Sequence, residues 1–218
     1  VEIVAEGKLG EVVIKSNNES TLVIAAAVIC QGLQISYSGA SQDLMAAIDI
    51  RADKPVFLNC SIAFSTSNGL IIDRNSNPIF QNCQIYKNNK FGIVFLEAAL
   101  GEFEKCSIFE NEFSNLKLIK AANPKFIQCN IFRSKWNGIY AIEGSLGEFR
   151  ECAIYANDYP NIYIANESDP NFVNCKIYEG KGIGIMVDEA GKGIFRQCEI
   201  FSNTYSNITT ESGGNPVF

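Results

Sequence analysis

The sequence predicts an all-β chain wound into a right-handed parallel β-helix, and three observations lead to this fold class. Seven of the eight cysteines recur every 23 residues. A phenylalanine stands three residues before each of the seven, and an isoleucine stands two residues after it. Later in each repeat, apolar residues alternate with period two, which is typical of strands. A fixed period of this length indicates a solenoid, and 23 residues suit three short strands joined by three turns.

The repeated residues are expected to stack into ladders, because successive coils of such a solenoid lie about 4.8 Å apart. We expect the Phe, Cys and Ile ladders to form the buried core of about nine coils. The Phe ladder comprises Phe57, Phe80, Phe103, Phe126, Phe149, Phe172 and Phe195, with Phe218 beginning the next coil. The Cys ladder comprises Cys60, Cys83, Cys106, Cys129, Cys152, Cys175 and Cys198, and the Ile ladder Ile62, Ile85, Ile108, Ile131, Ile154, Ile177 and Ile200. A Gly or Asn nine residues after each Cys is expected to adopt a left-handed turn conformation.

The cysteine ladder is interpreted as a row of free thiols. An unbroken ladder offers no preferred pairing, and parallel side chains suit a disulfide poorly. Free thiols favour a reducing compartment, so we predict a cytoplasmic protein. Cys30 alone lies outside the series and is the one cysteine considered for reactivity. The chain contains no histidine that could activate a thiol.

A second period of 46 residues lies on top of the first. Every second coil opens with Asn-Pro or Asp-Pro, and the coils between open with Gly. Segment 77–85, Asn-Pro-Ile-Phe-Gln-Asn-Cys-Gln-Ile, and segment 147–157, Gly-Glu-Phe-Arg-Glu-Cys-Ala-Ile-Tyr-Ala-Asn, are clear instances. The repeating unit is therefore a double coil.

This double-coil motif resembles the β-helix repeats of the F-box-only ubiquitin-ligase substrate receptors and their bacterial relatives, within the wider pectin-lyase-like group. The resemblance covers about residues 48–218. In the F-box receptors the domain is understood to be a protein-binding surface, so the resemblance implies a binding scaffold. The sequence contains no F-box, and no ubiquitin role is carried over.

Residues 1–54 are less regular than residues 55–218, which carry the repeat. We expect the first range to form one or two irregular coils of the same continuous domain, with an excursion at residues 38–42. The chain stops at the opening of a further coil. An uncovered coil exposes unpaired backbone groups, so we expect either a piece excised from a longer chain or end-to-end self-association.

Composition excludes several classes of function. The net charge of −6 argues against a protein that neutralises nucleic-acid phosphates. The apolar runs are too short to span a membrane. No residue pattern indicates a cofactor or a metal site, and we predict neither.

Two readings compete for a column of glutamates, Glu97, Glu143 and Glu189, spaced 46 residues apart. Two coils separate neighbours, so their carboxylates are expected about 9.6 Å apart. This distance lies near the upper limit of about 9.5 Å for an inverting acid–base pair. The other interpretation is a solvated turn carboxylate repeated with the double coil, and it leads us to assign no catalytic residue. Asp188 beside Glu189 is a weak candidate for cation binding.

A strip of outward side chains is the main candidate for a binding site. In the strand that follows each Gly or Asn, the middle residue is expected to point outward. These middle residues include Val94, Tyr140, Tyr163 and Met186. A second column, from Tyr86 to Phe201, is interpreted as an aromatic stack that stabilises the coil. We predict a non-catalytic scaffold that binds another protein, with binding or processing of a polysaccharide by a lyase-, hydrolase- or epimerase-like module as the alternative.

Overall fold

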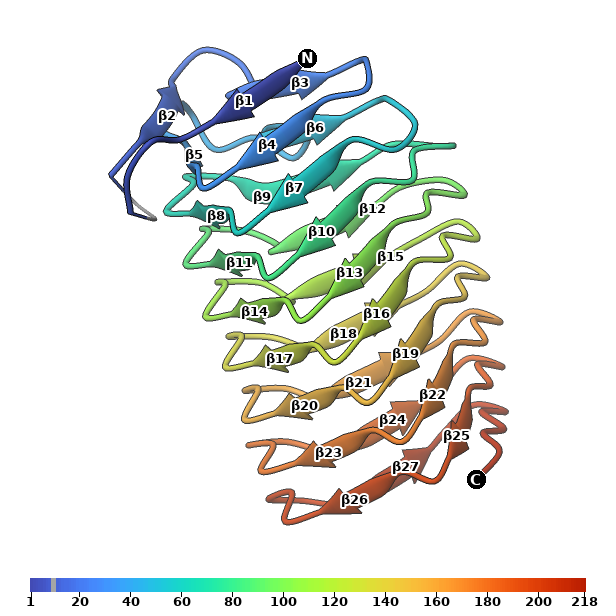
Figure 1. Ribbon diagram of the computed structural model, residues 1–218. Helices are drawn as coiled ribbons and strands as arrows, with labels where there is room; N and C mark the ends of the chain where they lie inside the picture. Colours follow the sequence, from blue (N-terminus) through green and yellow to red (C-terminus); the bar gives the residue numbers. More distant parts are fainter. Residues whose placement is uncertain (9–10) are drawn as a thin grey trace.

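The structure, a computed structural model, describes residues 1–8 and 11–218. The chain forms a parallel β-solenoid in which each turn contributes one strand to each of three nine-stranded sheets (Figure 1). The predicted fold class, three strands per coil and about nine coils are therefore confirmed. Among the described residues, no helix is long and apolar enough to cross a membrane.

The three sheets are named here A, B and C. Sheet A consists of β1 (Glu2–Val4), β4 (Ile29–Gln31), β7 (Val56–Leu58), β10 (Ile79–Gln81), β13 (Glu102–Glu104), β16 (Lys125–Ile127), β19 (Glu148–Arg150), β22 (Asn171–Val173) and β25 (Ile194–Arg196). Sheet B consists of β2 (Val13–Ser16), β5 (Gln34–Tyr37), β8 (Ser61–Ala63), β11 (Gln84–Tyr86), β14 (Ser107–Phe109), β17 (Asn130–Phe132), β20 (Ala153–Tyr155), β23 (Lys176–Tyr178) and β26 (Glu199–Phe201). Sheet C consists of β3 (Leu22–Ile24), β6 (Ala46–Ile50), β9 (Asn68–Ile72), β12 (Ile93–Phe95), β15 (Leu116–Leu118), β18 (Ile139–Ala141), β21 (Ile162–Ile164), β24 (Ile185–Val187) and β27 (Ile208–Thr210).

The predicted ladders form the core. The rings from Phe57 to Phe195 stack with centroids 4.5–5.2 Å apart and nearly parallel planes. The Cys and Ile ladders are buried beside them, except that Cys198 and Ile200 of the last turn are only partly buried. Full burial of each apolar side chain stabilises the fold by about 1.5–3 kcal/mol, so the repeated interior supplies most of the folding free energy.

The expectation that the Gly or Asn nine residues after each Cys is left-handed is wrong. Left-handed φ angles occur directly before the Cys, as at Gln128 (54°), and two residues after the ladder Ile, as at Arg133 (54°). Gly138 is needed for space instead. A Cβ there would lie 2.6 Å from both the carbonyl oxygen of Asn161 and the Nδ2 of Asn157, in the next turn.

The same contacts explain the 46-residue period. Asn157 and Asn161 are fully buried, and Asn157 Nδ2 donates a hydrogen bond of 2.8 Å to Asn161 Oδ1. The turn before carries Gly138, which leaves room for this pair. From Gly92 onward, turns with the asparagine pair alternate with turns that carry a glycine at the second position, whereas Gly69 and Gly92 stand in consecutive turns.

The second turn contains the expected excursion, which runs between β5 and β6 over residues 38–45 and is called here the excursion loop. Thr66 Oγ1 donates a hydrogen bond of 2.7 Å to the Gly39 carbonyl. Asn68 Nδ2 donates to the carbonyls of Asp43 (2.9 Å) and Met45 (3.0 Å). These contacts hold the loop against the following turn at the edge of sheet C. All three sheets run from the first two turns into the regular repeat.

The second aromatic column lies on the outside of sheet B. Rings from Tyr86 to Phe201 stack with centroids 4.8–5.2 Å apart and planes within 8° of parallel. All but Phe201 are half-buried. The column thus points outward, and its rings cover one another, which fits the expected role of stabilising the stack.

Candidate functional site

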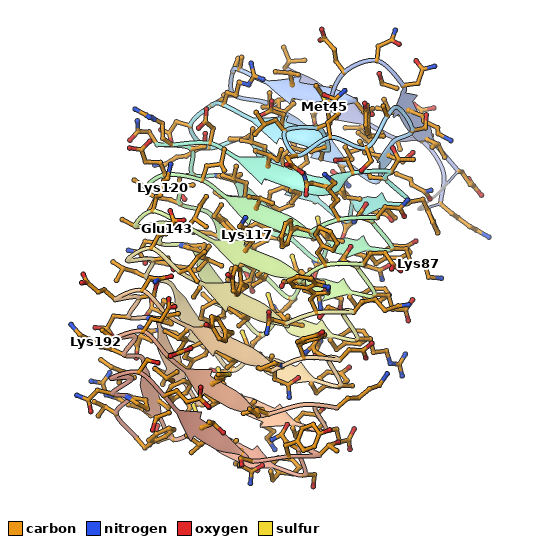
Figure 2. The ribbon with its side chains drawn as sticks, turned by 180° about the vertical axis from the view of Figure 1, so that it is seen from behind. Met45, Lys87, Lys117, Lys120, Glu143 and Lys192 are labelled. Carbon is orange, nitrogen blue, oxygen red and sulfur yellow. The ribbon has the colours of Figure 1, made fainter. Side chains whose placement is uncertain are left out.

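The outward residues of sheet C form one column along the solenoid. Each lies between two buried neighbours, as Tyr140 lies between Ile139 and Ala141. Strand pairing places them in direct register from one turn to the next, and Figure 2 looks onto this face. The column consists of Asp49, Ile71, Val94, Lys117, Tyr140, Tyr163 and Met186. The predicted strand register agrees with the structure, whereas a binding role for these residues stays a prediction.

The lower half of the column is an open aromatic strip, defined here as Tyr140, Tyr163 and Met186. The two tyrosine rings stack with centroids 5.4 Å apart and planes 25° apart. All three side chains are half-buried. The strip therefore presents the edges of two stacked rings and one thioether side chain over three successive turns.

Carboxylates border the aromatic strip. The hydroxyl of Tyr163 lies 3.4 Å from Asp188 Oδ2. Burial, and then the charge of Asp188, raise the pKa of Tyr163 to about 12. Burial also raises the pKa of Tyr140, and the charges of Glu189 and Glu143 add to this effect. Two of the predicted glutamates thus lie close enough to the strip to influence its tyrosines.

The glutamate column itself stands at the turn that leads from sheet C to sheet A (Figure 2). Glu97 forms an ion pair of 2.5 Å with Arg74 in the preceding turn. Glu189 accepts a hydrogen bond from the Asn166 side chain. Glu143 and Glu189 both have left-handed φ angles, of 59° and 45°. The column is therefore built into a turn, and the alternative acid–base role, which the sequence did not favour, is untested.

Val94 lies in the column but differs from the aromatic strip in exposure. It is only 8% exposed, because it packs with Ile71 and Ala46 and with the partly buried Phe91 and Leu96. The side chain therefore offers little surface to a ligand. Below it, the Lys117 ammonium lies 5.0 Å from the centre of the Phe91 ring.

Sequence reasoning missed a third aromatic column at the corner where sheet B leads into sheet C. These corner aromatics are Phe113, Trp136 and Tyr159, with centroids 5.4 and 5.8 Å apart. Trp136 is 48% exposed and Tyr159 57% exposed. The signal was present in the sequence, because the three residues share the 23-residue spacing.

Sequence reasoning also missed a hollow at the upper end of the same face, called here the Asp49 hollow. Its volume is about 270 Å³, and it is lined by Leu44, Asp49, Arg51, Ile71, Asp73 and Leu96. The sequence signal was the alternation of Ile48, Asp49 and Ile50, which repeats the pattern of the regular strands. Asp49 precedes Ile71 by 22 residues rather than 23, which places it outside the regular series.

The cysteines of this fold are free and mostly enclosed. All eight are free thiols, and all but Cys198 are buried. Burial raises the pKa of Cys30 to about 11. Hydrogen bonding with Cys129, and then burial, raise the pKa of Cys152 to about 12. Since the thiolate is the reactive form, these shifts disfavour Cys30 and Cys152 as nucleophiles at neutral pH. Hydrogen bonding with Cys83 lowers the pKa of Cys60, but that thiol is buried.

Residues 1–8 and 11–218 contain no cluster of metal ligands. Nowhere in these ranges do three or more His, Cys, Asp or Glu side chains gather in a way that could hold a metal. Asp188 and Glu189, the adjacent carboxylates considered from the sequence, belong to no such group.

Several solved structures share the fold. The periplasmic alginate epimerase AlgG matches with a TM-score of 0.66 and 12% identity over 81% of this chain and 47% of its own. Pectate lyase Pel9A matches with a TM-score of 0.57 and 15% identity over 96% of this chain and 68% of its own. The ORF18 protein of Geobacillus virus E2 matches with a TM-score of 0.67 and 15% identity over 96% of this chain and 48% of its own. The chain therefore spans about half the length of AlgG.

These likenesses confirm the pectin-lyase-like fold expected from the sequence. They give no support to the expected relationship with F-box receptors. No curated protein matches the chain. The family model for the right-handed β-helix region matches residues 12–131 and 114–218, which together include most of the sequence. The chain belongs to the right-handed β-helix family.

Proposed function

We propose that the chain binds an uncharged polysaccharide along the outer face of sheet C, over the aromatic strip and the corner aromatics. The observation that carries this proposal is the stacked, half-buried pair of Tyr140 and Tyr163, 5.4 Å apart. The two rings cover each other's inner faces, so a ligand meets their exposed edges and hydroxyl groups. Two rings in successive turns thus offer apolar edge contacts and hydroxyl groups to successive sugar units.

The polar groups beside the strip suit hydroxyl groups. The Asp188 carboxylate lies next to the Tyr163 hydroxyl, and Glu143 and Glu189 act on Tyr140 through their charges. Carboxylates accept hydrogen bonds from sugar hydroxyls and repel anionic ligands. The net charge of −6 acts in the same direction. This charge pattern favours a neutral polysaccharide over an acidic one.

The fold comparisons support a polysaccharide rather than a protein as the ligand. The similar structures include an alginate epimerase and a pectate lyase, whose names refer to reactions on polysaccharides. We extend only the class of ligand to this chain, and we propose binding without turnover. The protein partner and the cytoplasmic location expected from the sequence stay predictions.

A glycan array that contains neutral and acidic oligosaccharides, followed by calorimetry with the best binder, tests the proposal. Tyr163→Ala and Trp136→Ala are each expected to weaken binding at least about tenfold, because truncating a well-packed aromatic contact costs about 2 kcal/mol. Tyr178→Ala is the matched control, since Tyr178 is a stacked, half-buried tyrosine on sheet B.

Binding restricted to acidic glycans, or equal losses in Tyr163→Ala and Tyr178→Ala, would contradict the proposal. Absence of glycan binding, together with a purified protein ligand that Tyr163→Ala fails to bind, would favour the protein scaffold instead.

A further inference from the structure

The Asp49 hollow contains a buried carboxylate with unused hydrogen-bonding capacity. The Asp49 side chain is 9% exposed, and its Oδ2 accepts both Nε (3.0 Å) and Nη2 (2.5 Å) of Arg51. None of the hydrogen bonds found among residues 1–8 and 11–218 uses Asp49 Oδ1. Among the described residues, the fully enclosed side-chain atoms that lack a partner are Ser61 Oγ and Ser114 Oγ, so Asp49 Oδ1 is open to solvent and can receive a donor from a ligand.

The other groups around the hollow extend the same chemistry. Asp73 Oδ1 accepts the backbone N–H of Arg74 at 2.7 Å, which leaves Oδ2 for a second donor. The Arg51 side chain is 57% exposed, and Nη1 is a further donor beside its pair with Asp49. The hollow thus combines two carboxylate acceptors with one guanidinium donor.

The walls of the hollow are apolar. Leu44 comes from the excursion loop, whereas Ile71 and Leu96 come from β9 and the turn after β12. Apolar walls around a few convergent polar groups are typical of small-molecule sites. The volume of about 270 Å³ lies just below the range of about 300–1,000 Å³ for drug-sized ligands. The hollow therefore suits one compact ligand rather than a chain that passes through it.

We infer that the Asp49 hollow binds a single neutral sugar unit with free neighbouring hydroxyl groups, such as the end unit of a polysaccharide. Two hydroxyls donate to Asp49 and Asp73, Arg51 donates to a third oxygen, and the C–H face of the ring packs on the side chains of Leu44 and Leu96. The charges of Asp49 and Arg51 offset each other, and Asp73 disfavours an anionic sugar.

This inference deepens the proposed function and rests on it for the identity of the ligand, but the hollow is a separate site. Asp49 stands four turns above Tyr140 in the same column, about 19 Å away at the usual strand spacing. The covered residues Ile71 and Val94 lie between them. Binding in the hollow is therefore measurable without the aromatic strip.

The inference is tested by titrating the whole chain with D-glucose, D-galactose and D-mannose. The binding is monitored by NMR through the chemical shifts of the Ile71 and Leu96 methyl groups. We expect saturable shifts with at least one hexose and none with its fully O-methylated form. Asp49→Asn should weaken this binding at least tenfold, and Asp53→Asn, an exposed aspartate outside the hollow, should leave it unchanged. Leu44→Trp, which fills the hollow from a side chain that is 70% exposed, should abolish it. This variant decides the question if Asp49→Asn does not fold.

The outcomes separate the two proposals. Hexose shifts that persist in Tyr163→Ala support the hollow, even if no oligosaccharide binds to the aromatic strip. Absence of hexose shifts, shifts unchanged in Leu44→Trp, or shifts confined to Tyr140 and Tyr163 would overturn the hollow as a sugar site. Oligosaccharide binding at the strip would still stand in those cases.

Discussion

The upper and lower halves of the outer face of sheet C share one strand geometry but differ in what reaches solvent. Val94 and Tyr163 occupy the same position in the column, three turns apart. Val94 is 8% exposed, whereas Tyr163 is half-buried. Phe91 and Leu96 flank the upper residue, and the Asp43–Lys90 ion pair ties the excursion loop to the turn beside it. A side chain that points outward from a strand is therefore not necessarily accessible to solvent.

The exposure of the outer residues can differ between the two halves because both halves have the same buried core. Phe80 in the upper half and Phe149 in the lower half are each fully buried between stacked rings. Since the ladders supply the stability, the outer columns are free to change from turn to turn. Repetition marks the core of this protein, and departures from repetition mark its candidate sites.

The largest expected effect tests the shared interior. Phe80→Ala and Phe149→Ala should each lower the free energy of unfolding by about 3–5 kcal/mol, because each removes a buried ring and leaves a cavity. Urea denaturation followed by circular dichroism measures both. Losses that differ by more than about 2 kcal/mol would show that the two halves do not share an equivalent core.

A matched pair of substitutions tests the difference between the halves directly. Val94→Asp should lower the free energy of unfolding by about 2 kcal/mol or more, because it places a carboxylate in an apolar cluster. Tyr163→Asp should cost less than Val94→Asp, about 1 kcal/mol, since the Tyr163 side chain is half-buried rather than enclosed. Equal losses in the same denaturation experiment would remove the distinction between covered and open halves.

The core was predictable because it depends on a periodic pattern. The 23-residue spacing of Phe, Cys and Ile identified the buried ladders, and alternation around Tyr140 identified the outward strip. Spacing alone did not reveal why a glycine is needed at position 138. The reason is that a side chain there would collide with Asn157 and Asn161 in the next turn. Such contacts between turns depend on the three-dimensional stacking of the coil.

The candidate sites were predictable only in part. The covering of Val94 depends on its neighbours Phe91 and Leu96, which spacing does not relate to it. The Asp49 hollow depends on the excursion loop, which interrupts the repeat and shifts Asp49 out of register. The corner aromatics did follow the period, so a search of every column for aromatic residues would have found Trp136.

Thiol accessibility tests whether the interior is closed along the whole length. The denatured protein should react rapidly with Ellman's reagent at all eight cysteines, and the native protein should react far more slowly at the seven buried ones. Cys198, which is only partly buried, should react first. Cys198→Ser identifies that phase. Several disulfides in the native protein would contradict both the free-thiol ladder and the predicted cytoplasmic location.

The smallest expected effect concerns the ionisation of Tyr163 in the open half. Its pKa is raised to about 12, first by burial and then by Asp188, whereas an unfolded tyrosine titrates near pH 10. The folded state therefore favours the neutral phenol. This contribution to stability is fully present below about pH 10 and is lost as the pH rises through about 12.

Phenolate absorbance, measured as the difference between wild type and Tyr163→Phe, should show this late titration. Asp188→Asn should move it to lower pH, and Glu211→Gln, an exposed carboxylate in the last turn, should not. Titration of Tyr163 near pH 10 in the folded protein would mean that its ring is as open to water as a free tyrosine. The aromatic strip would then lack the partly buried rings on which the proposed sugar contact depends.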